Sequence, residues 1–320
     1  MRLRALTLTA ALLLGSCIVH AQTTPVIIDT DIGDDIDDVF AVDLALVSPE
    51  LKILGITSAW GDTELRARMI DRLLCETGRS DIPVHVGVPT KTSTDFTQAP
   101  WAKAGLAHPH SDGVTFLLSQ IKAHPGEITL LALGPLTNIG AAIDRDPATF
   151  RKLKRVVLMG GAVHRGYGDV NAKPEPEYNI ARDPKAAQKL VKSGVPLYFL
   201  PLDSTQLEFN AEKRAAFATI STPMTDALQV LVEEWAHRAK REVVLFDAVA
   251  ALYAVDATSC PMTPLHLEVD DKGMTLPTPG TPNANACLTA EPERFFSVLV
   301  PRLTQQRLVG TQVCVARATK

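Results

Sequence analysis

Short apolar runs alternate with amphipathic stretches along most of the chain. Continuous apolar segments, which are typical of strands covered on both faces, occupy residues 26–29, 52–58, 84–87, 128–133, 155–159, 196–200 and 265–269. Apolar residues at helical spacing occupy residues 37–47, 64–76, 113–123, 136–143, 184–192, 211–220, 225–239, 247–255 and 292–305. Strands that alternate with helices predict an α/β fold with an open, mostly parallel, Rossmann-like sheet and helices on both of its faces.

The segments between these elements predict where a ligand binds. Two long polar loops cover residues 89–111 and 161–182, and a polar stretch with proline and glycine covers residues 275–282. The chain has no internal repeat and no break in composition, so a single domain over residues 22–320 is expected. Ligands of such sheets bind beyond the carboxyl ends of the strands, which directs attention to the residues that follow each strand.

The first 21 residues read as a secretory signal peptide. Arg2 and Arg4 precede an apolar run over residues 5–19, and small residues at Val19 and Ala21 suit a cleavage site. The run is short for a membrane span. The stretch Leu14-Gly15-Ser16-Cys17 also resembles a lipoprotein box, so a lipid anchor at Cys17 is the alternative. Both interpretations predict an exported protein, periplasmic or secreted.

Export would place the remaining cysteines in an oxidising compartment, where a disulfide is possible. These cysteines are Cys75, Cys260, Cys287 and Cys314. Their spacing does not define a pairing, and four separate buried thiols are the alternative.

Composition excludes several classes of protein, and the placement of the acids adds a candidate chemistry. Apolar residues make up 46 % of the chain and the formal net charge is −4, which argues against disorder and against nucleic-acid binding. Seven of the 36 acidic residues, however, lie between positions 29 and 43, directly after the first apolar run. Carboxylates this close repel one another unless a cation compensates, and hard oxygen ligands favour Ca²⁺ or Mg²⁺.

Three metal-carboxylate schemes compete for this cluster. An EF-hand loop that started at Asp29 would need glycine at position six and glutamate at position twelve, and the chain has Asp34 and Phe40 there. A haloacid-dehalogenase-like phosphatase would use Asp29 as nucleophile and Asp31 as acid, but it leaves Gly33 and the further acids unexplained. The third scheme is a nucleoside hydrolase.

Six segments, in order, resemble motifs of the inosine-uridine preferring nucleoside hydrolases. The first is the acidic segment from Asp29-Thr30-Asp31-Ile32-Gly33 to Asp37-Asp38. The others are residues 56–62, the turn Gly134-Pro135-Leu136-Thr137-Asn138, residues 159–162, the segment from Asn171 to Glu177-Tyr178-Asn179, and Phe246-Asp247-Ala248. The resemblance runs from about residue 26 to the C-terminus.

The resemblance implies a Ca²⁺ ion that holds the ribose 2′- and 3′-hydroxyls and a water. Carried over, Asp31, Asp38 and Asp247 would bind the ion by carboxylate and Thr137 by its backbone carbonyl, and Asp31 would take the proton of the attacking water. The ribose hydroxyls would be held by Asp37, Asn171, Glu177 and Asn179, with Met159 lining the sugar pocket and Asp62 within the substrate site. This assignment is chemically reasonable, because a metal lowers the pKa of its bound water and carboxylates stabilise an oxocarbenium-like transition state.

Three departures from the family pattern, one of them a two-residue insertion, are present. Asp34 and Asp35 are inserted before the Asp37-Asp38 pair and offer a rival register, and Asp62 replaces an asparagine. Phe246 replaces the histidine that helps to protonate the leaving base in purine-handling members. His108, His110, His164 and His237 are the candidate substitutes, with His108 and His110 first because they precede Asp112-Gly113 in a loop that resembles a base-contacting one.

The sequence therefore predicts an exported, Ca²⁺-dependent N-ribohydrolase of nucleoside salvage, which the resemblance further expects to be a homo-oligomer. Two other functions fit the same residues. One is a periplasmic ribose- or nucleoside-binding protein that keeps the metal site without turnover, given Phe246. The other is a metal-dependent phosphatase.

Overall fold

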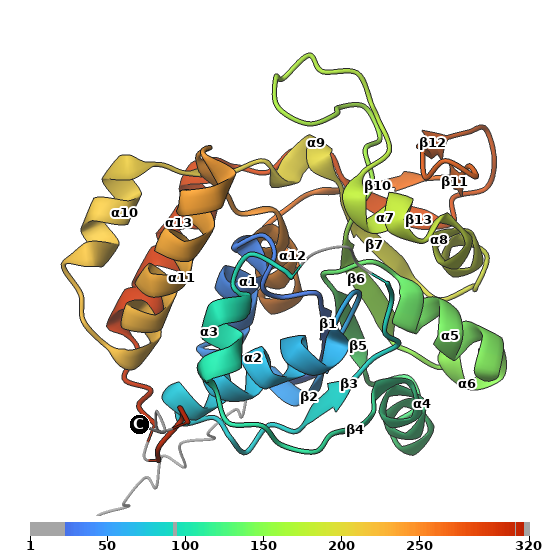
Figure 1. Ribbon diagram of the computed structural model, residues 1–320. Helices are drawn as coiled ribbons and strands as arrows, with labels where there is room; N and C mark the ends of the chain where they lie inside the picture. The colour runs from blue at the N-terminus through green and yellow to red at the C-terminus, as the bar shows by residue number, and fades with distance from the viewer. Residues whose placement is uncertain (1–22, 92–94, 311, 317–320) are drawn as a thin grey trace, which may run out of the picture.

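A nine-stranded sheet forms the centre of the molecule (Figure 1). The computed structural model describes residues 23–91, 95–310 and 312–316, so the predicted leader and Cys17 lie outside the described residues. The sheet order is β10 (Met262–Leu265), β13 (Ala284–Cys287), β7 (Leu197–Leu200), β6 (Arg155–Met159), β5 (Thr129–Ala132), β1 (Thr24–Thr30), β2 (Leu51–Ser58), β3 (Val84–Val86) and β4 (Ser111–Asp112). All neighbours pair in parallel except β10 and β13. The predicted α/β fold with a mostly parallel sheet is confirmed.

Helices cover both faces of this sheet. Toward one face lie α1 (Asp37–Leu46), α2 (Thr63–Glu76), α12 (Phe246–Val255) and α13 (Pro292–Gln305), with α11 (Pro223–Ala239) and α10 (Ala211–Ala218) outside them (Figure 1). The other face carries α4 (Gly113–Ala123), α5 (Thr137–Arg145), α6 (Pro147–Phe150) and α8 (Pro184–Val191). No helix among the described residues combines the length and the apolar character needed to cross a bilayer.

The side chains of β1 show why this strand is central. Val26 and Ile28 belong to the hydrophobic cluster on the α1 face, whereas Ile27 belongs to the cluster on the α5 face. Alternate residues of a strand point to opposite faces, so a strand buried on both sides must be apolar at every position. In the sheet, β1 has β2 as its neighbour on one side and β5 on the other, so the order of the strands reverses at β1. The carboxyl ends of β1 and β5 therefore flank the topological switch point, where open α/β sheets bind ligands.

The sequence pattern did not predict several short elements. The loop predicted over residues 89–111 contains α3 (Ala99–Ala104) and reaches β4, and the second loop ends in α7 (Tyr178–Arg182). The strand predicted over residues 265–269 is divided between β10 and β11 (Leu267–Val269), which pairs with β12 (Thr275–Pro277) in a separate small sheet. Two more short elements are α9 (Leu202–Thr205) and the pair β8 (Glu208–Phe209) with β9 (Val243–Val244). Elements of two to six residues carry too few apolar positions to show a period.

The four cysteines of the described region form two disulfides. Cys75 on α2 is joined to Cys314 near the C-terminus, with the Cα atoms 5.6 Å apart. Cys260 and Cys287 are joined at a Cα distance of 5.9 Å, beside the antiparallel pair β10 and β13. The hypothesis that these cysteines form disulfides is confirmed, and the alternative of four separate buried thiols is wrong.

Asp43 lies on α1 with its side chain in the apolar core, where it is 0 % exposed. Neither of its carboxylate oxygens has a hydrogen-bond partner among the described residues, and burial raises the pKa of this carboxyl well above its ordinary value. A buried carboxyl without a partner costs free energy, and this cost grows once the group ionises.

Replacing Asp43 should therefore stabilise the protein. We expect Asp43→Ala to raise the free energy of unfolding at pH 8 by about 1–3 kcal/mol, measured by urea denaturation. The pKa of Asp43 is higher in the folded than in the unfolded chain, so its contribution to folding is complete at low pH and is lost as the pH rises. The gain in stability from Asp43→Ala should therefore be smaller at pH 5 than at pH 8. Asp43→Asn, which keeps the shape and removes the titration, isolates the pH-dependent part. A gain that is equal at both pH values would contradict this account.

Candidate metal centre and active site

A cavity of about 760 Å³ lies at the carboxyl ends of β1, β5 and β6. Asp31 reaches it from the segment after β1, Leu133 from the end of β5 and Met159 from the end of β6. Two helices bring further groups: α1 carries Asp37 and Asp38, and α12 carries Asp247. The position agrees with the ligand site expected at the switch point of the sheet.

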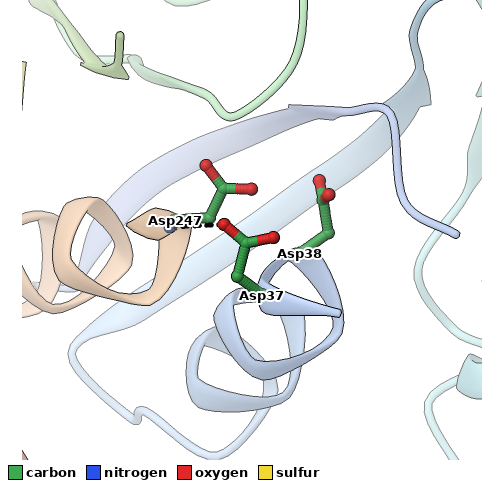
Figure 2. Close-up of side chains that lie close together, drawn as sticks. All are labelled: Asp37, Asp38 and Asp247. Carbon is green, nitrogen blue, oxygen red and sulfur yellow. Dashed lines mark hydrogen bonds between the residues drawn. The ribbon is translucent and has the colours of Figure 1, made fainter. Parts of the chain in front are cut away.

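Three carboxylates meet at the floor of this cavity. Asp37 and Asp38 lie in the first turn of α1, and Asp247 lies in the first turn of α12 (Figure 2). One oxygen from each lies within 4.8 Å of the others, and all three residues are buried. The Asp247 backbone N–H donates to Asp37 Oδ2 at 3.1 Å, which ties the two helix ends together. Anionic side chains suit a helix N-terminus, where the helix dipole is positive.

Burial and mutual repulsion act on these carboxyl groups in the same direction. Desolvation is the largest cause that raises the pKa of Asp37 and Asp247 well above the ordinary value, and the neighbouring aspartates raise it further. Burial also raises the pKa of Asp38 to about 7, although the Thr30 hydroxyl donates to it. Asp247 Oδ1 is buried and has no hydrogen-bond partner among the described residues. A cluster of this kind fits a cation, because a cation offsets both the repulsion and the desolvation.

Asp31 adds a fourth acid to the cavity. It is buried, and desolvation followed by the charge of Asp38 raises its pKa well above the ordinary value. Its backbone carbonyl accepts a hydrogen bond from the Arg66 guanidinium, which also donates to the carbonyl of Ile32 at 2.8 Å. Arg66 therefore holds the loop that presents Asp31. The closest trio contains Asp37 in place of Asp31, a difference from the metal set of Asp31, Asp38 and Asp247 that the resemblance implies.

Hydrogen bonds from β2 and α5 hold the carboxyl end of β1 in place. Asp29 is buried and accepts from the Thr57 hydroxyl and from Asn138 Nδ2, the latter at 2.7 Å. The same Asn138 amide donates to the Ser58 carbonyl at 3.0 Å, so one side chain links β1, β2 and α5. Burial raises the pKa of Asp29 to about 6. Asp29 does not line the cavity and acts in support of the residues that do.

Glu177 and Asn179 form another part of the cavity wall. Glu177 is the N-cap of α7 and accepts from the backbone N–H groups of Gly161, Asn179 and Ile180, at 2.9, 2.9 and 3.1 Å. Asn179 Nδ2 donates to the Leu133 carbonyl at 2.8 Å and to the Met159 carbonyl at 3.2 Å. These bonds hold both side chains in place against the strand ends. The structure thus brings Met159, Glu177 and Asn179 together with the acidic cluster, as the sequence indicated.

Three other predicted site residues lie elsewhere. Thr137 opens α5 and does not line the cavity, whereas Leu133, four residues earlier at the strand end, does. Asn171 is exposed in the loop between β6 and α7. Asp62 is the N-cap of α2, accepts from Leu65 N–H at 3.0 Å, and lines an adjoining cavity of about 450 Å³ that shares Asp34 and Tyr178 with the acidic one.

None of the described histidines lines the acidic cavity. His110 is held against α2, where its Nε2 lies 2.8 Å from Asp71 Oδ2 and its pKa is raised by that contact. His108 lines a smaller cavity of about 240 Å³ beside the Cys75–Cys314 disulfide. His164 and His237 are exposed. Their positions therefore do not support the prediction that one of these four takes the role of the missing histidine. Phe246, which occupies its place in the sequence, does line the acidic cavity.

The inserted acids Asp34 and Asp35 lie at the rim of the cavity. Asp35 forms an ion pair with Arg241 at 2.6 Å, and Asp34 accepts from the Thr97 hydroxyl at 3.1 Å. Each therefore ties the loop after β1 to one neighbouring wall. Asp37 and Asp38, rather than this rival pair, belong to the trio with Asp247.

Sequence reasoning missed Tyr167 and Gln206. Both lie in the cavity wall, Tyr167 on the loop between β6 and α7 and Gln206 directly after α9. Burial, followed by the charge of Glu177, raises the pKa of Tyr167, so its phenol stays protonated and acts as a hydrogen-bond donor. The available signal was an aromatic residue between glycines in a loop that follows a strand end.

Comparison with known proteins agrees with this geometry. The family model described as "Inosine-uridine preferring nucleoside hydrolase" matches residues 26–297. An uncharacterised protein of Schizosaccharomyces pombe is 34 % identical over 207 residues, which cover 60 % of this chain and 65 % of that protein. The pyrimidine-specific ribonucleoside hydrolase RihB of Escherichia coli is 34 % identical over 193 residues, which cover 56 % of this chain and 60 % of that protein. The match thus spans less than two thirds of the length of these relatives.

Solved structures show the same fold over most of the chain. The plant nucleoside hydrolase PpNRh1 has a TM-score of 0.79 at 27 % identity, and the match covers 89 % of this chain and 100 % of that one. A purine-preferring ribonucleoside hydrolase from Gardnerella vaginalis has a TM-score of 0.72 at 24 % identity, covers 88 % of this chain and 98 % of that one, and supports the fold alone.

Proposed function

The chain belongs to the inosine-uridine preferring nucleoside hydrolase family, and we propose that it is a Ca²⁺-dependent enzyme that hydrolyses ribonucleosides to ribose and free base. The observation that carries the proposal is the convergence of Asp37, Asp38 and Asp247 within 4.8 Å at the floor of the cavity. A buried acidic floor with polar walls suits the vicinal diol of a ribose, and a volume of about 760 Å³ accommodates a nucleoside.

The residues at the floor fit a calcium ion. All the candidate ligands are hard oxygens. Asp247 Oδ1 is buried without a hydrogen-bond partner in the part of the chain that the structure describes, and a bound cation would supply one. Asp37, Asp38 and Asp247, the closest trio, would hold the ion. The family resemblance adds Asp31, which lines the same cavity. When bound, the ion would hold the ribose diol and lower the pKa of a water molecule at the site.

The side chains of the cavity then have distinct proposed roles. Asp31 would accept the proton of the attacking water as general base. Asp37, Glu177 and Asn179 would bind the ribose hydroxyls, with Met159 beneath the sugar. As the N-glycosidic bond breaks, positive charge develops on the ribose, and the carboxylates of the floor stabilise it electrostatically.

A reducing-sugar assay tests the function directly. The purified protein is incubated with inosine, uridine, adenosine and cytidine, with added Ca²⁺ or with EDTA, and free ribose and free base are measured together. Equal release of ribose and base is the expected result. Nucleoside binding by calorimetry without ribose release would instead indicate a binding protein, and inorganic phosphate released from a phosphorylated ribose would indicate a phosphatase.

Export is part of the proposal, and the two disulfides support it. Stable disulfides form in oxidising compartments and are rare in the cytosol. Both pairs, Cys75–Cys314 and Cys260–Cys287, have Cα separations within the usual range for a disulfide. Fractionation of cells that produce the full chain locates the protein. N-terminal sequencing of the mature form decides between cleavage after Ala21 and a lipid anchor at Cys17, and light scattering tests the expected homo-oligomer.

Loss of the long-range disulfide should weaken the fold. Cys75 and Cys314 are 239 residues apart in sequence, so their bond restricts a large part of the unfolded chain. We expect Cys314→Ser to lower the free energy of unfolding by about 2–4 kcal/mol in urea denaturation. The matched control is the double variant Cys75→Ser with Cys314→Ser, which should lose no more than the single one. Unchanged stability under oxidising conditions would contradict the contribution of this bond.

A further inference from the structure

The acidic cavity has an aromatic wall next to its sugar-binding side. Phe246 is 9 % exposed and lines the cavity at the start of α12. The ring of Tyr167 stands edge-on to it, with the ring centroids 6.1 Å apart and an interplanar angle of 79°. Tyr167 belongs to the loop between β6 and α7, the yellow-green segment that projects beyond the sheet next to α9 in Figure 1. An apolar wall of two rings suits a planar nucleobase.

The backbone around Tyr167 is held in place on both sides. Gly168 N–H donates to Gln206 Oε1 at 2.7 Å, and Gln206 Nε2 donates to the Gly166 carbonyl at 3.0 Å. One amide side chain thus clamps the peptide groups that flank Tyr167. The Tyr167 N–H donates to Glu175 Oε1 at 3.2 Å. Although Tyr167 is 38 % exposed, its backbone is therefore fixed by these bonds, and its ring contacts Phe246.

The hydroxyl of Tyr167 has one firm partner and one weak partner. It accepts from the Tyr178 backbone N–H at 3.0 Å, which leaves its own proton to donate. The acceptor of that proton, Glu177 Oε1, lies at 3.5 Å, the outer limit of a hydrogen bond. Because Glu177 already accepts from three backbone N–H groups, it loses little if the hydroxyl turns away. The donor therefore lies next to the proposed ribose ligand Glu177, on one of the two rings that form the aromatic wall.

The two cations of the cavity wall are already engaged. Arg241 is paired with Asp35 at 2.6 Å, and the Arg165 guanidinium donates to the Gly168 carbonyl at 2.7 Å. No described histidine reaches the cavity. Among the neutral donors that line the cavity, Tyr167 is the one that contacts both Phe246 and the proposed ribose ligand Glu177.

We propose that the Tyr167 hydroxyl is a catalytic residue that donates a hydrogen bond to the nucleobase as it leaves, an inference that rests on the proposed function. The C1′–N bond breaks and its electron pair passes to the base nitrogen, where the Tyr167 hydrogen bond stabilises the developing negative charge. The oxygen of water bonds to C1′ and its proton passes to Asp31. The base takes up one proton from solvent, which balances the proton that Asp31 later releases.

The test compares two leaving groups in the wild-type protein and in Tyr167→Phe. Uridine and inosine release a base that needs a hydrogen-bond donor, whereas 4-nitrophenyl β-D-ribofuranoside releases a phenolate that leaves without one. We expect Tyr167→Phe to lower kcat/KM for the nucleosides by about 10²-fold and to leave that for the nitrophenyl riboside near the wild-type value. Tyr198→Phe removes the same atom on β7, outside the cavity, and should match the wild type with both substrates.

The outcomes separate this inference from the proposed function. If the wild type releases ribose from all substrates and Tyr167→Phe loses equally with each, or loses with none, the assignment to Tyr167 is overturned and the hydrolase function stands. If the wild type releases ribose from none of the substrates, the hydrolase function is overturned, and the role of Tyr167 falls with it. A selective loss on nucleosides supports both.

Discussion

Replacing Asp31 with alanine should lower kcat/KM for ribonucleosides by about 10³- to 10⁴-fold. Asp31 is the proposed general base and a proposed metal ligand, and it lies buried in the cavity beside Asp38. Its removal takes away the acceptor for the proton of water and one negative charge from the metal site. The same variant should therefore bind Ca²⁺ more weakly in titration calorimetry.

Two further variants define this experiment. Asp31→Asn keeps the size of the side chain and one oxygen ligand but cannot accept the proton, so its activity should fall while part of the Ca²⁺ affinity remains. Asp144→Ala removes an exposed acid on α5 that pairs with Lys189, and it should behave as the wild type. Full activity in Asp31→Ala would show that the proton acceptor is another group.

Removing Ca²⁺ should abolish ribose release and lower the thermal stability of the protein. A ligand that binds only the folded state at 100 times its dissociation constant contributes about 2.7 kcal/mol to stability. We expect this loss of stability because, without a cation, the buried carboxylates of the floor repel one another and their desolvation is not offset. Activity and melting temperature are measured after EDTA treatment and again after Ca²⁺ is restored.

The pH dependence of this effect has a definite sign. The pKa values of Asp29 and Asp38, about 6 and about 7, lie above the ordinary value near 3.8. The contribution of such groups to folding is complete below the unfolded pKa and is lost as pH rises through 6 to 7. The metal-free protein should therefore be less stable at pH 8 than at pH 5. Because Ca²⁺ binds the ionised carboxylates, its stabilising effect should grow over the same interval.

Matched controls separate Ca²⁺ binding from the effect of ionic strength. Mg²⁺ at the same concentration demands a smaller, octahedral site and should restore less stability. Asp38→Asn removes one ligand and should reduce the Ca²⁺-dependent shift in melting temperature. A shift that is the same for both ions, or the same at both pH values, would argue against the proposed calcium site.

Much of the site was predictable because local chemistry and strand ends coincide. The buried strand that ends at Thr30 is followed at once by acids, and parallel strands bring their carboxyl ends to one edge. Asp31, Asp37 and Asp38 could thus be placed in a binding site from the local pattern. Met159 ends the strand β6, Glu177 and Asn179 stand at the start of the next helix, α7, and the structure brings all three to the same cavity.

Other positions depend on packing between distant segments. Asp247 meets Asp37 across 210 positions of sequence because the first turns of α12 and α1 pack together. His108 and His110 lie between α3 and β4, where His110 contacts Asp71 on α2 and His108 lines a smaller cavity, so neither reaches the acidic one. Tyr167 enters the site because Gln206, from another loop, holds the backbone on both sides of it.

The sequence by itself determined the fold class, the acidic character of the site and the family resemblance. These follow from periodicity and from residues that lie close together in the chain. Only the tertiary structure decided which acids form the closest trio, that Leu133 rather than Thr137 lines the cavity, and that the aromatic wall is built by Phe246 and Tyr167. These features depend on the exact approach of helix ends and loops, which side-chain packing sets and local sequence does not encode.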